Sequence, residues 1–385
     1  MTDRYFVWKV YEPKEKRNKI AAFDMDHTLI CPKEGRTFPK TKDDIEWWHK
    51  DIPNILQQLY KDGYHIVIFT NQSGIQRGKV KQSDVEWRIN WIQENTGVPL
   101  SYYIAPYINK YRKPIPGMWK HFKKVIGILV NYKDSFYCGD ACGRKGDYTQ
   151  GDYLFAMNCK LSFKTPEELV GLKFKSDEEK RERLTPNASY IDFDKVHNYL
   201  RHDSKYPEPT TPAKNSMILM MGAPASGKST YVNGLCEQSP FWESAVIISN
   251  DTHTKGQMKK KMEEAVKLKS PIIVDNTHST KKQRQPFIEF AVENKYSIVV
   301  VHVKTCLQVA MHLNVWRMYK YDKPLIPFVA YATWNKNKED IDEEKEAKYI
   351  TEIVEYMPEL STSVMKFRAN GFYKEVKRLD KLHLK

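Results

Sequence analysis

The chain has 385 residues, of which 41% are hydrophobic and 12% aromatic, and its formal net charge is +14. This length predicts about two domains, and the composition excludes a disordered chain. No apolar run reaches the roughly 20 residues that a spanning helix needs, so we expect no membrane association. The six cysteines show no CxxC spacing, which predicts reduced thiols and argues against a zinc site. The positive charge favours a polyanionic partner, above all nucleic acid.

Short apolar runs alternate with amphipathic stretches in the first half, which is the pattern of an α/β fold with a parallel sheet. The predicted strands are Ile20–Phe23, His65–Phe69, Tyr102–Ala105 and Ser135–Cys138. The predicted helices are Ile52–Lys61, Asp84–Glu94 and Met118–Leu129.

The composition changes between Gly171 and Asn215, where a charged run leads into a proline-rich segment that cannot continue a helix or a central strand. We therefore expect an N-terminal extension (1–18), a first α/β domain (19–172), a linker (173–215) and a second α/β domain (216–385). The strands predicted in the second domain are Met217–Met221, Ala245–Ile248, Ile272–Val274 and Ile298–Val301. Its predicted later helices are Leu307–Met318 and Asn335–Lys348.

Polar and charged side chains that could take part in catalysis follow the predicted strands of the first half. Two carboxylates, Asp24 and Asp26, come directly after the first strand, within the sequence Asp-Met-Asp-His-Thr. Because parallel strands end at one edge of a sheet, residues after later strands should lie beside them. These residues are Thr70, Asn71, Lys113 and Asp140. One carboxylate can attack phosphorus while its neighbour protonates the leaving oxygen, if a cation offsets their repulsion.

This set resembles the haloacid dehalogenase superfamily of aspartyl-phosphate phosphatases, which implies a Rossmann-like parallel sheet. The resemblance implies that Asp24 is the nucleophile and that Asp26 is the general acid and base. It further implies phosphate binding by Thr28, Thr70, Asn71 and Lys113, and Mg²⁺ binding by Asp24, Asp26, Asp140 and the Met25 carbonyl. His27 stands where this superfamily commonly has glycine.

Longer stretches are similar to the phosphatase half of animal polynucleotide kinase 3′-phosphatases. They are Phe69–Lys79, Tyr111–Pro114, Gly117–Trp119 and Gly139–Arg144. Sugar-phosphate and histidinol-phosphate phosphatases have a segment like Thr70–Ile75, so a small-molecule phosphatase fused to an unrelated kinase remains an alternative.

A phosphate-binding loop follows the strand Met217–Met221 and precedes a helix, the context that the GxxxxGKS motif requires. Its backbone amides can hold a triphosphate at the helix N-terminus, with Lys228 reaching the β- and γ-phosphates and Ser229 binding Mg²⁺. The predicted ATP-binding residues are Gly222, Ala223, Pro224, Ala225, Ser226, Gly227, Lys228, Ser229 and Thr230.

Three later features suggest the phosphoryl acceptor. Asp251 follows the second strand and can accept a proton from a hydroxyl, Asp275 follows the third, and Arg317 can close over the triphosphate. Together they resemble the kinase half of the polynucleotide kinase 3′-phosphatases, in which an arginine usually stands at Asn250 and a second lid arginine at Val315.

The resemblance extends from Lys19 to the C-terminus, and it implies a 3′-phosphatase and an ATP-dependent 5′-hydroxyl kinase that use Mg²⁺ to repair DNA strand breaks. Basic residues gather at 110–124 and 255–269, which fits DNA bearing 3′-phosphate and 5′-hydroxyl ends. We expect a nuclear rather than cytoplasmic monomer, with DNA ligase or a repair scaffold as further partners. We expect no N-terminal phosphopeptide-binding (FHA) domain. RNA ends are an alternative substrate, and a non-catalytic end-binding module is a third possibility.

Overall fold

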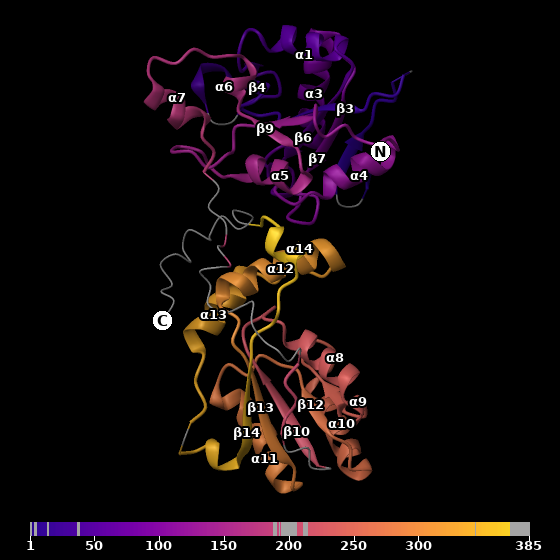
Figure 1. Cartoon of the computed structure of the whole chain (residues 1–385), viewed down its shortest axis with the longest axis vertical. Helices are drawn as coiled ribbons and strands as arrows, with labels where there is room; N and C mark the ends of the chain where they lie inside the picture. The colour runs from indigo at the N-terminus through magenta and orange to yellow at the C-terminus, as the bar shows by residue number, and fades with distance from the viewer. Residues whose placement is uncertain are drawn as a thin grey trace. The chain divides into compact units, whose positions relative to one another are not determined.

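The computed structural model describes residues 2–3, 6–13, 15–36, 39–187, 191, 193, 206–210, 215–342 and 344–369. The chain divides into two units, each with its own sheet, mostly parallel in the first unit and parallel in the second (Figure 1). The first unit comprises Met1–Tyr190, Arg317–Lys323 and Phe367–Lys385, and the second comprises Ile191–Trp316 and Pro324–Lys366. Among the described residues, none of the helices combines the length and apolar character that crossing a bilayer requires.

The first unit contains a seven-stranded sheet in the order β1-β2-β7-β6-β3-β8-β9. Its strands are β1 (Thr2–Asp3), β2 (Phe6–Lys9), β3 (Lys19–Phe23), β6 (Tyr64–Asn71), β7 (Ser101–Ala105), β8 (Phe136–Cys138) and β9 (Ser162–Lys164). The five strands from β3 onward are parallel, whereas β2 pairs antiparallel with β7. A separate hairpin joins β4 (Ile30–Cys31) to β5 (Glu46–Trp47).

Helices cover both faces of this sheet because successive residues of a buried strand point to opposite sides. Ala21 and Phe23 pack with α1 (Ile52–Lys61) and α3 (Gln82–Thr96). Ile20 and Ala22 pack on the other face with α4 (Gly117–Ile126) and α5 (Gly151–Cys159). The remaining helical segments are η1 (Lys33–Gly35), α2 (Ser73–Gln76), α6 (Pro166–Leu169) and α7 (Asp177–Leu184).

The four strands predicted in the first half are confirmed, as are the three helices, with shifted ends. Helix α4 ends at Ile126 rather than Leu129 because Gly127 adopts the left-handed conformation (φ 61°). Strand β2 lies in the predicted N-terminal extension, and α7 lies in the predicted linker. Part of that linker, 188–190, 192, 194–205 and 211–214, falls outside the described residues, as do positions 370–385 of the second predicted domain.

The second unit has a five-stranded parallel sheet in the order β11-β12-β10-β13-β14. Its strands are β10 (Ser216–Met221), β11 (Val246–Ile248), β12 (Ile272–Val274), β13 (Ser297–Val303) and β14 (Ile350–Tyr356). The elements α8 (Lys228–Gln238) and α9 (Pro240–Glu243) pack on one face, and α10 (Lys255–Leu268) and α11 (Lys281–Glu293) on the other. The other helical segments are α12 (Leu307–Tyr321), α13 (Phe328–Asn337), η2 (Ala347–Tyr349) and α14 (Thr362–Lys366).

The four strands predicted in this half and the helix Leu307–Met318 are confirmed. The predicted helix Asn335–Lys348 is wrong, because α13 ends at Asn337 and the described residues between it and η2 (338–342 and 344–346) are not helical. Arg284 accounts for this course, since its buried guanidinium donates hydrogen bonds to the carbonyls of Glu339 and Asp340. All six cysteines are free thiols, as predicted.

Candidate active sites

The carboxyl ends of β3, β6 and β8 bring the predicted residues of the first unit together. The Asp24 backbone N–H donates to the Cys138 carbonyl at 2.8 Å, which fixes the first carboxylate beside the loop that carries Asp140. Lys113 Nζ lies 2.7 Å from Asp24 Oδ1. Three chain segments therefore converge on one carboxylate at the edge of the sheet.

Lys113 lies at the centre of a buried hydrogen-bond network. Besides Asp24, its ammonium donates to Asp152 Oδ1 at 2.8 Å and to the Tyr137 hydroxyl at 2.9 Å. Burial alone would lower the pKa of Lys113, but the negative charges of Asp152 and Asp24 outweigh that effect and raise it. Lys113 is therefore held as a cation facing Asp24, where it can offset the charge of a phosphate.

Asp26, the predicted acid and base, is fixed by the residue after Asn71. Gln72 Nε2 donates to Asp26 Oδ2 at 2.6 Å and to the Thr70 hydroxyl at 2.9 Å. Directly after Asp26 the backbone turns sharply, and His27 adopts a left-handed conformation (φ 56°). That conformation explains why the related phosphatases commonly have glycine here, since glycine adopts it without steric cost.

The two remaining residues predicted to bind phosphate lie at the same edge. Thr28 is buried and donates to Asp140 Oδ1 at 3.3 Å. The Asn71 side chain clamps the backbone of Lys113, donating to its carbonyl at 3.1 Å and accepting from its N–H at 3.0 Å. Asn71 thus positions Lys113 through its backbone.

The carboxylates of Asp24, Asp140 and Asp152 form a group whose ligand atoms lie within 4.8 Å of one another. Burial raises the pKa of Asp24 to about 7, with further contributions from Asp152 and Asp26, and Lys113 offsets part of the rise. Burial, Asp152 and Asp24 also raise the pKa of Asp140 well above its usual range. Hard oxygen ligands with excess negative charge fit Mg²⁺. Asp26, predicted as a ligand, pairs with Gln72 outside this group.

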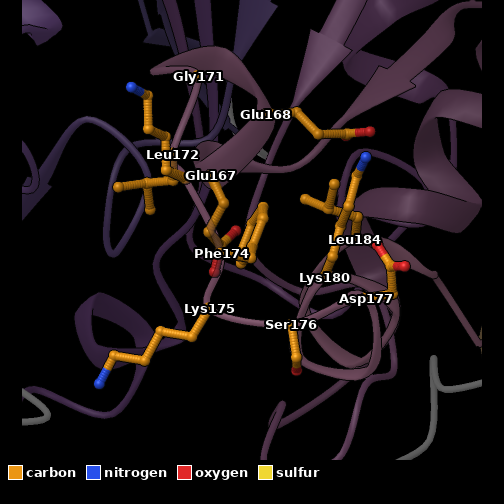
Figure 2. A pocket seen from close by; sticks show the side chains of 11 residues that line it. Glu167, Glu168, Gly171, Leu172, Phe174, Lys175, Ser176, Asp177, Lys180 and Leu184 are labelled. Atoms are coloured by element: carbon orange, nitrogen blue, oxygen red, sulfur yellow. The ribbon is translucent and has the colours of Figure 1, made fainter.

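A pocket of about 750 Å³ lies beside α6 and α7 in the same unit (Figure 2). It is lined by Glu167, Glu168, Gly171, Leu172, Lys173, Phe174, Lys175, Ser176, Asp177, Lys180 and Leu184, none of which is a predicted site residue. Arg144 links it to the site, because its guanidinium donates to Glu167 at 3.0 Å and to the Asp140 carbonyl at 2.8 Å. The pocket wall therefore supports the Asp140 loop.

The predicted triphosphate loop of the second unit follows β10 and leads into α8. Gly222 has φ 154°, and a Cβ there would lie 2.9 Å from both Ser226 Oγ and the Val303 carbonyl. Gly227, at the start of α8, has φ 103°. Lys228 is buried, and its ammonium donates to the carbonyls of Gly222 at 3.1 Å and Ala223 at 2.8 Å. The loop geometry thus depends on glycine at both ends, as the motif requires.

Ser229 donates to Asp275 Oδ2 at 2.6 Å. Burial raises the pKa of Asp275, as does the charge of Asp251, while the Ser229 hydrogen bond and Lys228 oppose the rise. A loop hydroxyl beside an aspartate from a neighbouring strand is the Mg²⁺-binding pair of P-loop enzymes, so this pair fits the ion. Asp251 is exposed, and it lies close enough to Asp275 for its negative charge to raise the pKa of that carboxyl.

Arg317 lies on α12, in a segment (Arg317–Lys323) that groups with the first unit. The P-loop belongs to the second unit, so the predicted lid role of Arg317 stays a prediction.

Sequence analysis missed three residues that contribute to the site of the first unit. Asp152 stands at the start of α5 with no motif around it, and Tyr137 lies inside a buried strand, where an aromatic residue usually signals only core packing. Gln72 lies within a recognised segment, and its place directly after Thr70 and Asn71 is the one signal that could have identified it.

Known proteins match both units of the chain. The family profile "Polynucleotide kinase 3 phosphatase" matches residues 19–170, and the profile "AAA domain" matches residues 250–337. A bifunctional polynucleotide phosphatase/kinase of Schizosaccharomyces pombe is 33% identical over 340 residues, which is 87% of this chain and 79% of that protein.

Two further relatives match the first unit. An uncharacterized 20.8 kDa protein of Autographa californica nuclear polyhedrosis virus is 42% identical over 163 residues, covering 41% of this chain and 88% of that protein. Polynucleotide 3′-phosphatase ZDP of Arabidopsis thaliana is 40% identical over 168 residues, covering 39% of this chain and 24% of that protein. Since the fission yeast relative spans both units, the chain belongs to the family of bifunctional polynucleotide phosphatase/kinases.

Proposed function

We propose that the chain makes broken DNA strands ligatable by removing a 3′-phosphate and adding a 5′-phosphate. The observation that carries this proposal is the presence, in one chain, of an aspartate facing a buried lysine and of a complete P-loop. One site is suited to removing phosphate and the other to transferring it. A single broken strand can present both a 3′-phosphate and a 5′-hydroxyl, so one chain that carries both sites can repair both ends of the same break.

In the first unit, Asp24 attacks the phosphorus of the terminal 3′-phosphate, and the bond between phosphorus and the 3′-oxygen breaks. Asp26 protonates the departing oxygen, leaving an aspartyl-phosphate on Asp24. Asp26 then takes a proton from water as that water attacks the phosphorus, which releases phosphate and regenerates Asp24. Lys113 offsets the charge of the phosphate throughout, and Gln72 holds Asp26 in position.

In the second unit, Asp251 accepts the proton of a 5′-hydroxyl as its oxygen attacks the γ-phosphorus of ATP, and ADP departs. Lys228 lies in the loop that binds the phosphates, so its charge can stabilise the transferring group.

We assign Mg²⁺ to both sites: Asp24 and Asp140 would hold it in the first unit, and Ser229 with Asp275 in the second. When bound, the ion offsets the negative charge of carboxylates and phosphate oxygens. Asp152 already accepts hydrogen bonds from Lys113, Tyr137 and the Ala141 N–H, so its role is to position Lys113.

We further propose that the protein is nuclear, because the proposed substrate is broken DNA. We propose that it acts as a monomer, before a DNA ligase or on a repair scaffold. The high positive charge supports a nucleic acid substrate but does not separate DNA from RNA. RNA ends are therefore the rival substrate, and matched DNA and RNA oligonucleotides would distinguish the two.

The test uses a nicked DNA duplex bearing a 3′-phosphate and a 5′-hydroxyl, with Mg²⁺ and ATP. Both ends are followed for the intact protein, for Asp24→Ala and for Lys228→Ala. We expect Asp24→Ala to abolish only phosphate removal and Lys228→Ala to abolish only phosphorylation. If the intact protein changes neither DNA end but processes the matched RNA, the DNA assignment is wrong.

A further inference from the structure

The Arg144 guanidinium closes the loop that follows β8 and carries Asp140. Its Nη2 donates to the Asp140 carbonyl at 2.8 Å, so it holds the backbone of that residue directly. Its Nε donates to both carboxylate oxygens of Asp147, at 3.2 and 3.0 Å. These bonds gather the two ends of the segment 140–147 around one buried cation.

The remaining nitrogen of the Arg144 side chain connects this loop to two helices. Nη1 donates to Glu167 Oε2 on α6 at 3.0 Å and to the Arg183 carbonyl on α7 at 2.7 Å. Glu167 is buried as well, so the ion pair is shielded from water. A planar guanidinium that donates to several fixed acceptors has one preferred orientation. Arg144 therefore holds the Asp140 loop at a defined place relative to α6 and α7.

The chain that follows α7 adds a second attachment to the same loop. The Asn187 N–H donates to the Cys142 carbonyl at 2.9 Å. Gly143 has φ 83°, and a Cβ there would lie 2.5 Å from the Asn187 carbonyl, so the two backbones are in close contact. The segment 183–187, which the sequence analysis assigned to the linker, thus supports the Asp140 loop.

Asp140 depends on this support because its own side chain is weakly held. Among the described residues, Thr28 is the side chain that donates to the Asp140 carboxylate, and that hydrogen bond is long at 3.3 Å. Mg²⁺ demands near-ideal octahedral geometry, so a carboxylate that binds it must stay in place. The position of the Asp140 carboxylate is therefore set through its backbone, which Arg144 holds.

We propose that Arg144 is a positioning residue for Mg²⁺, and that its buried pair with Glu167 fixes Asp140 in the place where the ion binds. The inference rests on the proposed function, because it assumes that Asp24 and Asp140 hold Mg²⁺. Arg144 bonds to the Asp140 carbonyl rather than to its carboxylate, so it acts on the ion through that residue. Replacing a residue that orients a metal ligand typically lowers metal affinity about 10- to 100-fold.

The experiment measures metal binding directly in the full-length protein without ATP. Mn²⁺, which prefers the same oxygen ligands as Mg²⁺, is titrated, and the free ion is followed by electron paramagnetic resonance. In parallel, phosphate release from a 3′-phosphorylated DNA oligonucleotide is measured over a range of Mg²⁺ concentrations. The variants are Arg144→Lys, Glu167→Gln, Asp140→Asn and, as a matched control, Arg181→Gln. Arg181 is an exposed arginine on α7.

Asp140→Asn identifies the Mn²⁺ site of the first unit by removing one of its ligands. We expect Arg144→Lys to weaken Mn²⁺ binding at that site about tenfold, because lysine keeps the charge but cannot donate to all the anchors in fixed directions. The Mg²⁺ concentration that half-saturates phosphate release should rise by the same factor, while kcat at saturating Mg²⁺ stays within about twofold. Glu167→Gln should give a smaller shift in the same direction, and Arg181→Gln should behave as the intact protein.

A purely structural role of Arg144 would lower kcat at every Mg²⁺ concentration and leave the half-saturating concentration unchanged, and that result overturns the inference. Unaltered Mn²⁺ binding in Arg144→Lys overturns it as well. If Arg144→Lys fails to fold, Glu167→Gln decides instead, because it removes one charge at nearly constant side-chain size. If Asp140→Asn leaves Mn²⁺ binding unchanged, the Mg²⁺ assignment of the proposed function is wrong, and the inference falls with it.

Discussion

Asp152 Oδ1 accepts a hydrogen bond from Lys113 Nζ at 2.8 Å, although 39 positions separate the two residues in the chain. The same oxygen accepts from the Tyr137 hydroxyl at 2.8 Å, and Asp152 Oδ2 accepts from the Ala141 N–H at 3.0 Å. These bonds leave the Asp152 carboxylate little freedom to move. Asp152 therefore fixes the position and the charge of the ammonium that faces Asp24.

Asp152→Asn is predicted to impair the phosphatase while sparing the kinase. Loss of the buried negative charge leaves Lys113 with Asp24 as its single carboxylate partner among the described residues. We expect phosphatase kcat/KM to fall about 10- to 100-fold, as for other charged hydrogen bonds. Kinase activity of the same sample is the control, because a drop in both activities would point to misfolding instead.

Gly222→Ala is predicted to inactivate the kinase selectively. Alanine at φ 154° would place its Cβ 2.9 Å from the Val303 carbonyl and Ser226 Oγ, so the loop must shift. The strain amounts to about 1–3 kcal/mol. We expect at least a tenfold loss of 5′-phosphorylation and unchanged 3′-phosphate release. Wild-type ATP binding in this variant would show that the loop tolerates the methyl group.

Arg284→Met is predicted to destabilise the second unit strongly. Arg284 is fully buried and donates to both carboxylate oxygens of Glu346, at 2.8 and 2.7 Å. Removing one partner of such a pair costs about 3–5 kcal/mol. The matched control is Lys281→Met on the same helix, whose more exposed pair with Asp342 should contribute much less to stability. Urea unfolding of both variants measures the difference, and equal midpoints would contradict the prediction.

Acid is predicted to destabilise the first unit through His65. Burial, and then the charge of Arg17, lower the pKa of His65 from 6.5 to about 4, so the folded state binds fewer protons than the unfolded state between these values. The contribution of neutral His65 to the free energy of unfolding is therefore fully present above pH 6.5 and is lost as the pH drops toward 4. Because one pKa unit corresponds to about 1.4 kcal/mol, the free energy of unfolding falls by about 3 kcal/mol over this pH range.

Unfolding free energies at several pH values test this expectation with two variants. His65→Gln should flatten the acid-induced loss, whereas His49→Gln, on the partly exposed turn before α1, should leave it unchanged. An unaltered acid slope in His65→Gln would exclude His65 as its source.

Affinity for DNA ends is predicted to depend on salt, because lysine and arginine contacts with phosphates release counterions. Binding of a 3′-phosphorylated duplex to Asp24→Ala, which is expected not to turn it over, should weaken steeply between about 50 and 200 mM salt. A flat response would contradict electrostatic recognition of the strand.

The sequence predicted the buried strands and the P-loop because each carries its own local signal. Ile272–Val274 is a continuous apolar run, and the spacing of the glycines before Lys228 is typical of a loop that binds phosphate. Strand β14 escaped prediction because only one face of it is buried, so its apolar residues are sparse and follow a charged stretch.

The phosphatase site was only partly predictable for a different reason. Asp24 and Lys113 stand in recognisable motifs, whereas Asp152 acquires its role from the packing of α5 against the sheet. Only folding brings its carboxylate to Lys113, and nothing in its neighbouring residues indicates that partner.

Strand β2 has a practical consequence for anyone shortening the chain. Its pairing with β7 covers a backbone edge, and Phe6 is buried with its ring 4.0 Å from that of Tyr111. A protein that begins at Lys19, where the family match starts, would lack β2 and Phe6. It would leave the backbone hydrogen-bonding groups of β7 unpaired and expose the ring of Tyr111 to water. Such an edge invites other chains to add to it, so the shortened phosphatase should self-associate or precipitate.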